Sequence, residues 1–267
     1  MKTSDTVERL DVAATRPSSV GGAIEPAVYV KDLDAPLVAL PVPQPAAENR
    51  YRLAAARLEA AIEARRSNGG KREARNMGRL ILITSAEDGD GKTTTALHVA
   101  TALSQAMGRR VALVEADTER PGLSSMLGLG AQRGLSEVMA GTISIDDVLL
   151  RGADSGPLLL PAGVDGGRAV RPGALLSSLN SLREYHDYVV VDTASLSRSA
   201  DAAVLGRAAD GVVLVVRAGA TSSHALSAAL EALVDTPILG CVLNDYDGLA
   251  GPAPTRGRGA TAYHDED

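Results

Sequence analysis

The stretch Ala86-Glu87-Asp88-Gly89-Asp90-Gly91-Lys92-Thr93 follows directly after the apolar run Leu80–Ile83. It matches the phosphate-loop pattern G-x-x-x-x-G-K-[ST] at every fixed position except the first, where Ala86 replaces glycine. Glycines without Cβ atoms let the backbone curl so that its N–H groups point at phosphate oxygens. Lys92 adds a positive charge for the β- and γ-phosphates, and the Thr93 hydroxyl is placed to bind Mg²⁺.

A helix is expected directly after this loop, from Thr94 to Met107, and its N-terminus would add positive potential at the phosphates. The alternative is an ordinary glycine-rich turn. The apolar strand before the loop and the helix after it favour phosphate binding. The residues expected to bind a nucleotide here are Gly89, Asp90, Gly91, Lys92, Thr93 and Thr94.

Length and composition limit the class of protein. The chain has 267 residues, 45% hydrophobic and 22% charged, enough for one sizeable domain with disordered ends. A net charge of −6 argues against a nucleic-acid-binding surface spread over the protein. The single cysteine, Cys241, lies in an apolar run, where a buried thiol is expected. No apolar run approaches the ~18 residues that span a bilayer, and we see no signal peptide, so a cytoplasmic protein is expected.

The chain divides into four segments. Residues 1–47 are rich in proline and are expected to form a disordered leader. Residues 48–75 hold a helical pattern and a basic linker, residues 76–247 the phosphate-loop domain, and residues 248–267 a disordered tail. The basic stretch 65–79 is either a solvated linker or a docking site for an acidic neighbour or an anionic membrane surface.

Short apolar runs alternate with helical stretches within the phosphate-loop domain. Runs that are apolar on both faces and separated by helices predict a mostly parallel sheet covered on both faces, the α/β architecture of P-loop NTPases. The carboxyl ends of the strands then meet at one edge of the sheet, together with the phosphate loop. The runs are Leu80–Ile83, Val111–Val114, Leu158–Leu160, Tyr188–Val191, Gly211–Val216 and Ile238–Leu243.

Carboxylates follow two of these runs. Glu115 and Asp117 end the second run on one side of the extended chain, and Asp192 ends the fourth. Carboxylates beside a phosphate loop can bind Mg²⁺ or accept a proton from an attacking hydroxyl, whereas acidic residues that cap the next helix are the alternative. We expect Lys92, Asp117 and Glu115 to be catalytic, and the metal ligands to be Thr93, Glu115, Asp117 and Asp192.

These segments, in this order and spacing, resemble the cytoplasmic domain of bacterial tyrosine kinases of capsule and exopolysaccharide systems, a branch of the MinD/ParA-like ATPases. The resemblance covers about residues 77–247. The partitioning ATPases carry an extra lysine early in the loop, where this chain has Glu87, which favours the kinase branch. Further matching stretches are Gly91–Thr94, Asp117 with Arg120-Pro121, Gly134–Val138, Leu160–Gly163, Tyr188–Thr193, Ala200–Ala202 and Val242–Asp245.

The resemblance implies a protein-tyrosine autokinase, an enzyme that uses ATP and Mg²⁺ to phosphorylate tyrosine residues of copies of the same protein. This activity would regulate polysaccharide polymerisation and export. Lys92 and Thr93 would hold phosphates and metal, and Asp117 would activate the tyrosine hydroxyl or bind the metal. Arg217 and Asn244 fall where family members contact the nucleotide base; a strand-end cation and a turn-forming asparagine are the alternatives. Implied partners are further copies of the chain and a membrane-embedded polysaccharide co-polymerase that activates it at the inner face of the plasma membrane.

The sequence departs from the family pattern at several positions. Glu115 stands where the family has aspartate, and Ala194-Ser195 replaces a pair of prolines. Arg171-Pro172 replaces Asn-Pro before a helix. Asn49–Arg52 keeps only a trace of the oligomerisation signature Glu-x-x-Arg-x-x-Arg. None of these changes removes the phosphate loop, so ATP binding is still expected.

The C-terminal tyrosine cluster of the family is absent as well. Tyr263 is the candidate phosphoacceptor, and Tyr246 follows the last strand. Two other functions therefore stay open beside the autokinase. One is a regulatory partner of the co-polymerase that binds or hydrolyses ATP without phosphorylating tyrosine. The other is a MinD/ParA-type positioning ATPase that binds DNA or membrane, against which Glu87 and the acidic charge balance count.

Overall fold

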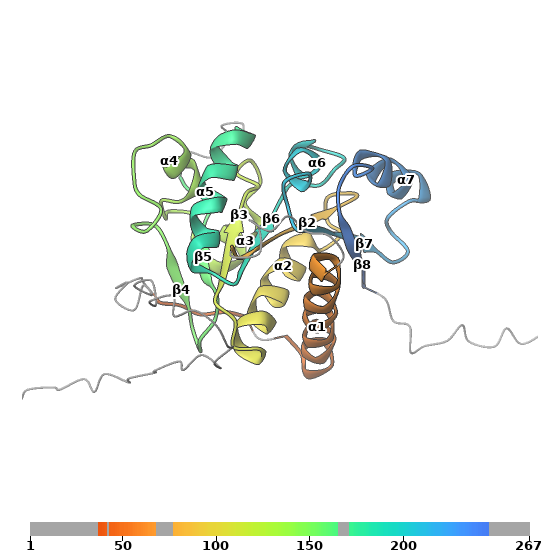
Figure 1. Ribbon diagram of the computed structural model, residues 1–267, viewed down its shortest axis with the longest axis horizontal. Helices are drawn as coiled ribbons and strands as arrows, with labels where there is room; N and C mark the ends of the chain where they lie inside the picture. Colours follow the sequence, from red (N-terminus) through yellow and green to blue (C-terminus); the bar gives the residue numbers. More distant parts are fainter. Residues whose placement is uncertain (1–36, 42, 68–76, 165–170, 246–267) are drawn as a thin grey trace, which may run out of the picture. The chain divides into compact units, whose positions relative to one another are not determined.

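An eight-stranded sheet forms the centre of the computed structural model, which describes residues 37–41, 43–67, 77–164 and 171–245. Its strand order is β1-β4-β5-β3-β6-β2-β7-β8 (Figure 1). The six strands from β5 to β8 run parallel, and β4 is antiparallel to β5. The strands are β1 Leu37–Val38, β2 Arg79–Ser85, β3 Val111–Glu115, β4 Leu150–Gly152, β5 Leu158–Leu160, β6 Tyr188–Asp192, β7 Gly211–Arg217 and β8 Ile238–Asn244.

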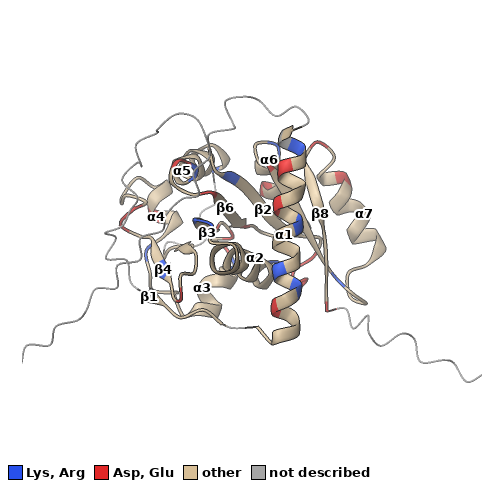
Figure 2. Cartoon of the chain, turned by 60° about the horizontal axis from the view of Figure 1, so that its bottom comes forward, with Lys and Arg blue, Asp and Glu red and all other residues tan. Residues whose placement is uncertain are grey.

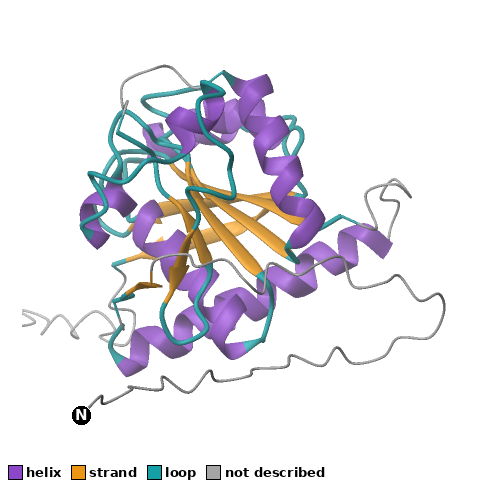
Figure 3. Ribbon diagram, turned by 90° about the vertical axis from the view of Figure 1, so that its left-hand side faces the viewer, coloured by secondary structure: helices purple, strands orange, loops and turns teal. Residues whose placement is uncertain are grey.

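Helices cover both faces of this sheet, as predicted (Figure 3). Alternation along β2 sends Ile81 and Ile83 to one face and Leu80 and Leu82 to the other. On the first face lie α1 Pro45–Ser67, α2 Lys92–Thr101 with its π-helical continuation η2 Ala102–Ala106, and α3 Gly122–Leu127. On the second face lie α4 Leu135–Met139, α5 Pro172–Tyr185, α6 Asp201–Gly206 and α7 Ser223–Ala232.

The six predicted apolar runs are confirmed as strands, each extended by at most three residues. The sequence reasoning missed β1, which has two residues, and β4, whose sequence Leu150-Arg151-Gly152 contains a single apolar residue and so forms no apolar run. The prediction of a leader over 1–47 is wrong at its end, because β1 lies at Leu37–Val38 and α1 begins at Pro45. The prediction of a buried Cys241 is also wrong: it lies on the edge strand β8 and is exposed.

Helix α1 packs against α2 through an aromatic contact. The rings of Tyr51 and His98 have centroids 4.8 Å apart, and His98 is buried. The remnant of the oligomerisation signature, Asn49–Arg52, thus contributes Tyr51 to a contact within the chain. Along its length α1 carries basic and acidic side chains mixed together (Figure 2).

The basic linker and the tail are only partly covered by the structure. Residues 68–76 and 246–267 lie outside the described residues, so the expectations for them stay predictions. Within the described ranges, no helix combines the length and the apolar character needed to cross a bilayer.

We expect Ile81→Ala to lower the free energy of unfolding by about 2–5 kcal/mol, because its side chain is fully buried between β2 and the α1–α2 layer. Urea denaturation followed by circular dichroism measures this. Leu243→Ala is the matched control, since Leu243 is 51% exposed on the edge strand and should change stability by less than about 1 kcal/mol. Equal losses for both variants would contradict the layered core.

Candidate functional site

The phosphate loop joins β2 to α2 and holds two residues in the left-handed region. Gly89 has φ 89° and Gly91 has φ 96°, values that L side chains rarely adopt. A Cβ atom on Gly91 would also lie 2.1 Å from Nδ2 of Asn244. Ala86 stands where the pattern has glycine, but it is buried and has no positive φ. The loop therefore requires glycine at 89 and 91 and tolerates alanine at 86.

Side chains brace the backbone of this loop. The Asp90 carboxylate accepts hydrogen bonds from the Glu87 backbone N–H at 2.9 Å and from the Thr221 hydroxyl at 2.7 Å. Asn244 donates from Nδ2 to the Asp90 carbonyl oxygen at 3.0 Å. The Asp90 side chain is thus engaged in fixing the shape of the loop, which leaves binding of a nucleotide by this residue to its backbone.

The two residues expected at the nucleotide base lie at the ends of neighbouring strands. Arg217 ends β7 and Asn244 ends β8, and the two are paired in register. The Arg217 guanidinium binds Oδ2 of Asp245 at 2.8 and 2.9 Å, and both side chains are exposed. Asn244 instead packs on the phosphate loop. A contact of either residue with the base stays a prediction.

Asp117 is the residue on which the charged groups of the site converge. Its side chain is 1% exposed, and its Oδ2 lies 3.7 Å from Nζ of Lys92. Arg198 binds both carboxylate oxygens, with Nη1 at 3.0 Å from Oδ1 and Nη2 in contact with Oδ2. The backbone N–H of Arg120 donates to Oδ1 at 3.1 Å. The structure therefore brings Lys92 and Asp117 together, and it adds a second cation to the pair.

Asp192 is a buried carboxylate whose two oxygens accept no hydrogen bond in the described part of the chain. Burial raises the pKa of Asp192 to about 7; Lys92 and the nearby Thr93 hydroxyl, which does not reach hydrogen-bond geometry, oppose this rise, and the carboxylates of Glu115 and Asp117 add to it. A buried carboxylate without donors is a group that a divalent cation would satisfy.

This arrangement fits Mg²⁺ bound together with phosphates. Among the described residues, no group of three or more His, Cys, Asp and Glu side chains could hold a metal ion alone. Mg²⁺ usually binds one or two carboxylates and takes its remaining ligands from water and substrate phosphates. Asp192, at the end of β6, and Thr93, in the first turn of α2, are the side chains that would hold it here.

Glu115 has a different environment from the one expected for a catalytic base or metal ligand. It is fully buried, and Oε1 accepts the backbone N–H of Leu123 at 2.6 Å. Ser124 donates from its backbone N–H at 3.1 Å and from its hydroxyl, and Ala162 donates its N–H at 3.2 Å. These bonds tie β3 to α3 and to the segment after β5. The geometry thus supports a structural role for Glu115 and not the predicted catalytic one.

Three residues of the site were missed by the sequence reasoning. Asp88 of the loop accepts a hydrogen bond from the Ser195 hydroxyl at 2.7 Å and lies 3.3 Å from Nε of Arg198. It also pairs with Arg120 at 2.7 Å. Ser195 and Arg198 lie between β6 and α6, where no strand or helix pattern marks them. The only available signal was Arg198 itself, the one basic residue in the mostly small-residue segment that follows Asp192.

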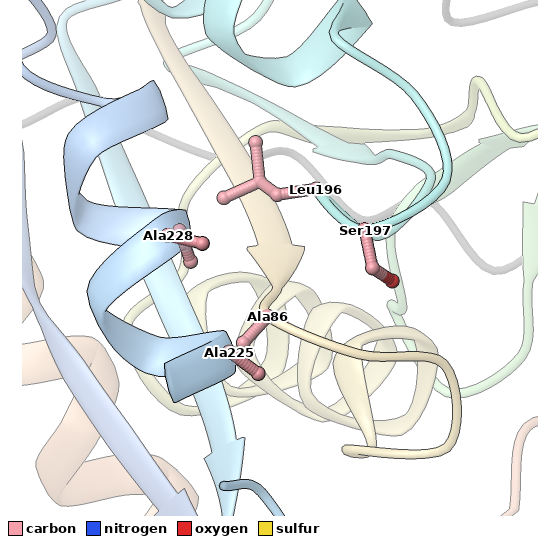
Figure 4. A pocket seen from close by; sticks show the side chains of 6 residues that line it. Ala86, Leu196, Ser197, Ala225 and Ala228 are labelled. Atoms are coloured by element: carbon pink, nitrogen blue, oxygen red, sulfur yellow. The ribbon is translucent and has the colours of Figure 1, made fainter. Parts of the chain in front are cut away.

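A small pocket of about 80 Å³ lies where β2 enters the phosphate loop (Figure 4). Helix α7 and the segment after β6 close it with mostly apolar side chains. It contains none of the charged residues described above, so it is not the phosphate site itself. Its lining residues are Ala86, Leu196, Ser197, Ala225, Ala228 and Ala229.

Comparison with known families decides the relationship. Residues 81–253 match the family model described as the CobQ/CobB/MinD/ParA nucleotide binding domain. The chain belongs to this family. The family resemblance inferred from the sequence is confirmed, and so is the expectation of a nucleotide-binding P-loop fold.

Curated relatives carry kinase and polysaccharide names. The chain is 32% identical over 181 residues to the tyrosine-protein kinase CpsD of Streptococcus pneumoniae, a match that covers 63% of this chain and 77% of CpsD. It is 34% identical over 177 residues to the succinoglycan biosynthesis transport protein ExoP of Rhizobium meliloti. That second match covers 63% of this chain but only 22% of ExoP.

Solved structures agree with this placement. The kinase domain of VpsO is 27% identical, with a TM-score of 0.57, and the match covers 75% of this chain and 98% of that domain. Cobyrinic acid a,c-diamide synthase from Mycobacterium smegmatis, solved with an ATP analog and magnesium, is 26% identical with a TM-score of 0.51. The second match covers 61% of this chain and 70% of the synthase. Within its family, the chain therefore groups with the bacterial tyrosine kinases.

We expect Asp192→Asn to stabilise the protein in the absence of Mg²⁺ and nucleotide, increasingly as pH rises. The folded protein keeps a proton on Asp192 up to about pH 7, whereas the ordinary pKa of an aspartate is 3.8, so ionisation makes folding less favourable between these two pH values. Asparagine cannot ionise. The difference in unfolding free energy between variant and wild type should widen by roughly 2 kcal/mol from about pH 5 to about pH 8.

Chemical denaturation in buffer with a chelator measures this difference. Asp147→Asn, at an exposed position, is the matched control for the loss of one carboxylate. If the difference in unfolding free energy between Asp192→Asn and wild type did not change with pH, burial would not disfavour the ionised form of this carboxylate.

Proposed function

We propose that the protein is an ATP- and Mg²⁺-dependent protein-tyrosine autokinase of a capsule or exopolysaccharide system. One observation carries the proposal: the loop lysine, Lys92, lies 3.7 Å from the buried carboxylate of Asp117, beside the unsatisfied carboxylate of Asp192. Such a set provides a phosphate-binding cation, a group that can accept a proton and a metal ligand in one place. The names of CpsD and ExoP support the tyrosine kinase and the polysaccharide parts of the proposal.

The chemistry follows from the residues of the chain. Phosphoryl transfer needs positioning and charge neutralisation more than covalent chemistry. The loop backbone and Lys92 would hold the β- and γ-phosphates, and Mg²⁺ would supply further neutralisation of their charge. The tyrosine oxygen attacks the γ-phosphorus while the bond to the β-phosphate oxygen breaks and ADP leaves. Asp117 would accept the proton of the tyrosine hydroxyl.

We further propose how the protein is placed in the cell. A membrane-embedded polysaccharide co-polymerase would activate it at the inner face of the plasma membrane, and the basic stretch 65–79 would lie near the anionic surface. In a homo-oligomer, one copy would offer Tyr263 to the site of another. The net charge of −6 and the mixed charges along α1 disfavour a nucleic-acid partner.

A second candidate function is a regulatory nucleotide switch that binds ATP and the co-polymerase without phosphorylating tyrosine. The observation that favours it is the state of Asp117, whose carboxylate is bound by Arg198 on both oxygens. A carboxylate held in this way has both oxygens engaged by the guanidinium and none turned toward an incoming tyrosine hydroxyl. Residues 246–267 contain two tyrosines, Tyr246 and Tyr263, in place of the family's cluster, which points in the same direction.

We expect Lys92→Met to lower tyrosine phosphorylation by at least about 100-fold, because the lysine neutralises the transferred group. The measurement is mass spectrometry of the protein incubated with Mg-ATP and peptides from the cytoplasmic segments of candidate co-polymerases. Arg207→Ala is a suitable control, since Arg207 is exposed and pairs with Asp235 away from the loop. Phosphotyrosine at wild-type level in Lys92→Met would contradict the proposal.

Tyr263→Phe separates the two candidate functions. For the autokinase, we expect this variant to lose most of its phosphotyrosine and to impair polysaccharide export in cells. For the regulatory switch, export should survive Tyr263→Phe and fail with Lys92→Met. Export is measured as cell-bound and secreted polysaccharide, with both variants expressed at the wild-type level.

A further inference from the structure

Arg198 is a cation that the phosphate-loop pattern does not contain. Its side chain is 15% exposed and lies among three carboxylates. The guanidinium binds both oxygens of Asp117, its Nε lies 3.3 Å from Asp88 of the loop, and its Nη1 lies 3.8 Å from Glu119. The Nε–H has no hydrogen-bond acceptor of good geometry in the described structure. Arg198 is thus held by charge at the loop with one donor unused.

The segment that carries Arg198 is fixed to the phosphate loop. The backbone N–H of Leu196 donates to the Ser85 carbonyl at 2.9 Å, and that of Ser197 to the Ala86 carbonyl at 3.1 Å. Leu196 and Ser197 lie beside Ala86, where β2 enters the loop (Figure 4). The backbone next to Arg198 is therefore held at the entry of the phosphate loop. Only a rotation of the side chain is needed to move the guanidinium.

The present partner of Arg198 conflicts with the proposed chemistry. Asp117 must have a free oxygen to accept a proton or to approach a metal ion, yet Arg198 occupies both. A guanidinium binds phosphate in the same two-pronged way as carboxylate. Nζ of Lys92 lies 3.7 Å from Oδ2 of Asp117. A triphosphate bound by Lys92 would therefore bring phosphate oxygens close to the Arg198 guanidinium, where they would compete with Asp117 for it.

We propose that Arg198 is a phosphate-binding residue that exchanges Asp117 for the γ-phosphoryl group of ATP. The inference rests on the proposed function and deepens it by naming a second cation of the transfer step. By leaving Asp117, Arg198 frees the carboxylate for the tyrosine proton. On the γ-phosphoryl group it neutralises charge as the β–γ bond breaks, and it gains and loses no proton itself. The site thus carries its own arginine for phosphoryl transfer, within the same chain.

Arg198→Ala and Arg198→Lys test this role through the difference between ATP and ADP. ADP lacks the γ-phosphoryl group, so a residue that binds this group should affect only ATP. We expect Arg198→Ala to weaken binding of a non-hydrolysable ATP analogue about 10-fold with Mg²⁺ present and to leave ADP binding within about twofold. Tyrosine phosphorylation should fall at least about 100-fold. Arg198→Lys keeps the positive charge but lacks the two parallel N–H donors of the guanidinium. It should recover part of the analogue binding and part of the tyrosine phosphorylation that Arg198→Ala loses.

Isothermal calorimetry with Mg-ADP and the Mg-bound ATP analogue gives the affinities, with Arg207→Ala as control. Circular dichroism checks that each variant is folded, and Arg198→Lys replaces the alanine variant if that one is not. Equal weakening of both nucleotides, or no weakening of the analogue, would overturn the role of Arg198. The wild-type protein could form no phosphotyrosine and still bind the ATP analogue more tightly than ADP, with this preference lost in the Arg198 variants. That result would overturn the proposed kinase activity and keep the inference about Arg198. Wild type that binds neither nucleotide would overturn both.

Discussion

The pairing of β6 with two neighbours is the constraint on which the site depends. Asp192, the last residue of β6, is in register with Glu115 of β3 on one side and with Ile83 of β2 on the other. Because all three strands are parallel, their carboxyl ends emerge together. The phosphate loop after β2 and Asp117 after β3 therefore have to meet above Asp192. A change of one residue in the register of β6 would send its carboxylate to the other side of the sheet.

The charges at this edge are arranged for a ligand and not for stability. Asp192 is buried and accepts no hydrogen bond of good geometry, which is costly, while Asp117 has Lys92 and Arg198 as partners. Glu115, two residues before Asp117, is satisfied by backbone and hydroxyl donors alone. Three carboxylates within a short distance along two strands thus have three different environments. Only the one that lacks partners is left for a cation to satisfy.

Much of the fold and part of the site could be predicted from the sequence. The apolar runs were long enough to define six strands, and the lysine and glycines of the loop depend on local geometry that a pattern captures. Cys241 was misjudged because apolar runs look the same in central and edge strands, and only the sheet order tells them apart. The role of Glu115 depends on where the amides of Leu123 and Ala162 lie, which no local pattern encodes. Arg198 was missed for the same reason, since its partner is 81 residues away.

The alanine at the first position of the phosphate loop has an evolutionary consequence. The methyl group of Ala86 faces a small apolar space that α7 lines with Ala225, Ala228 and Ala229 (Figure 4). The volume added at residue 86, compared with glycine, is accommodated by small side chains on a helix far away in the sequence. With glycine at position 86, the same space would admit bulkier residues on the facing side of that helix. Substitution histories of the loop and of the helix should therefore be coupled, although neither segment shares a chemical role with the other.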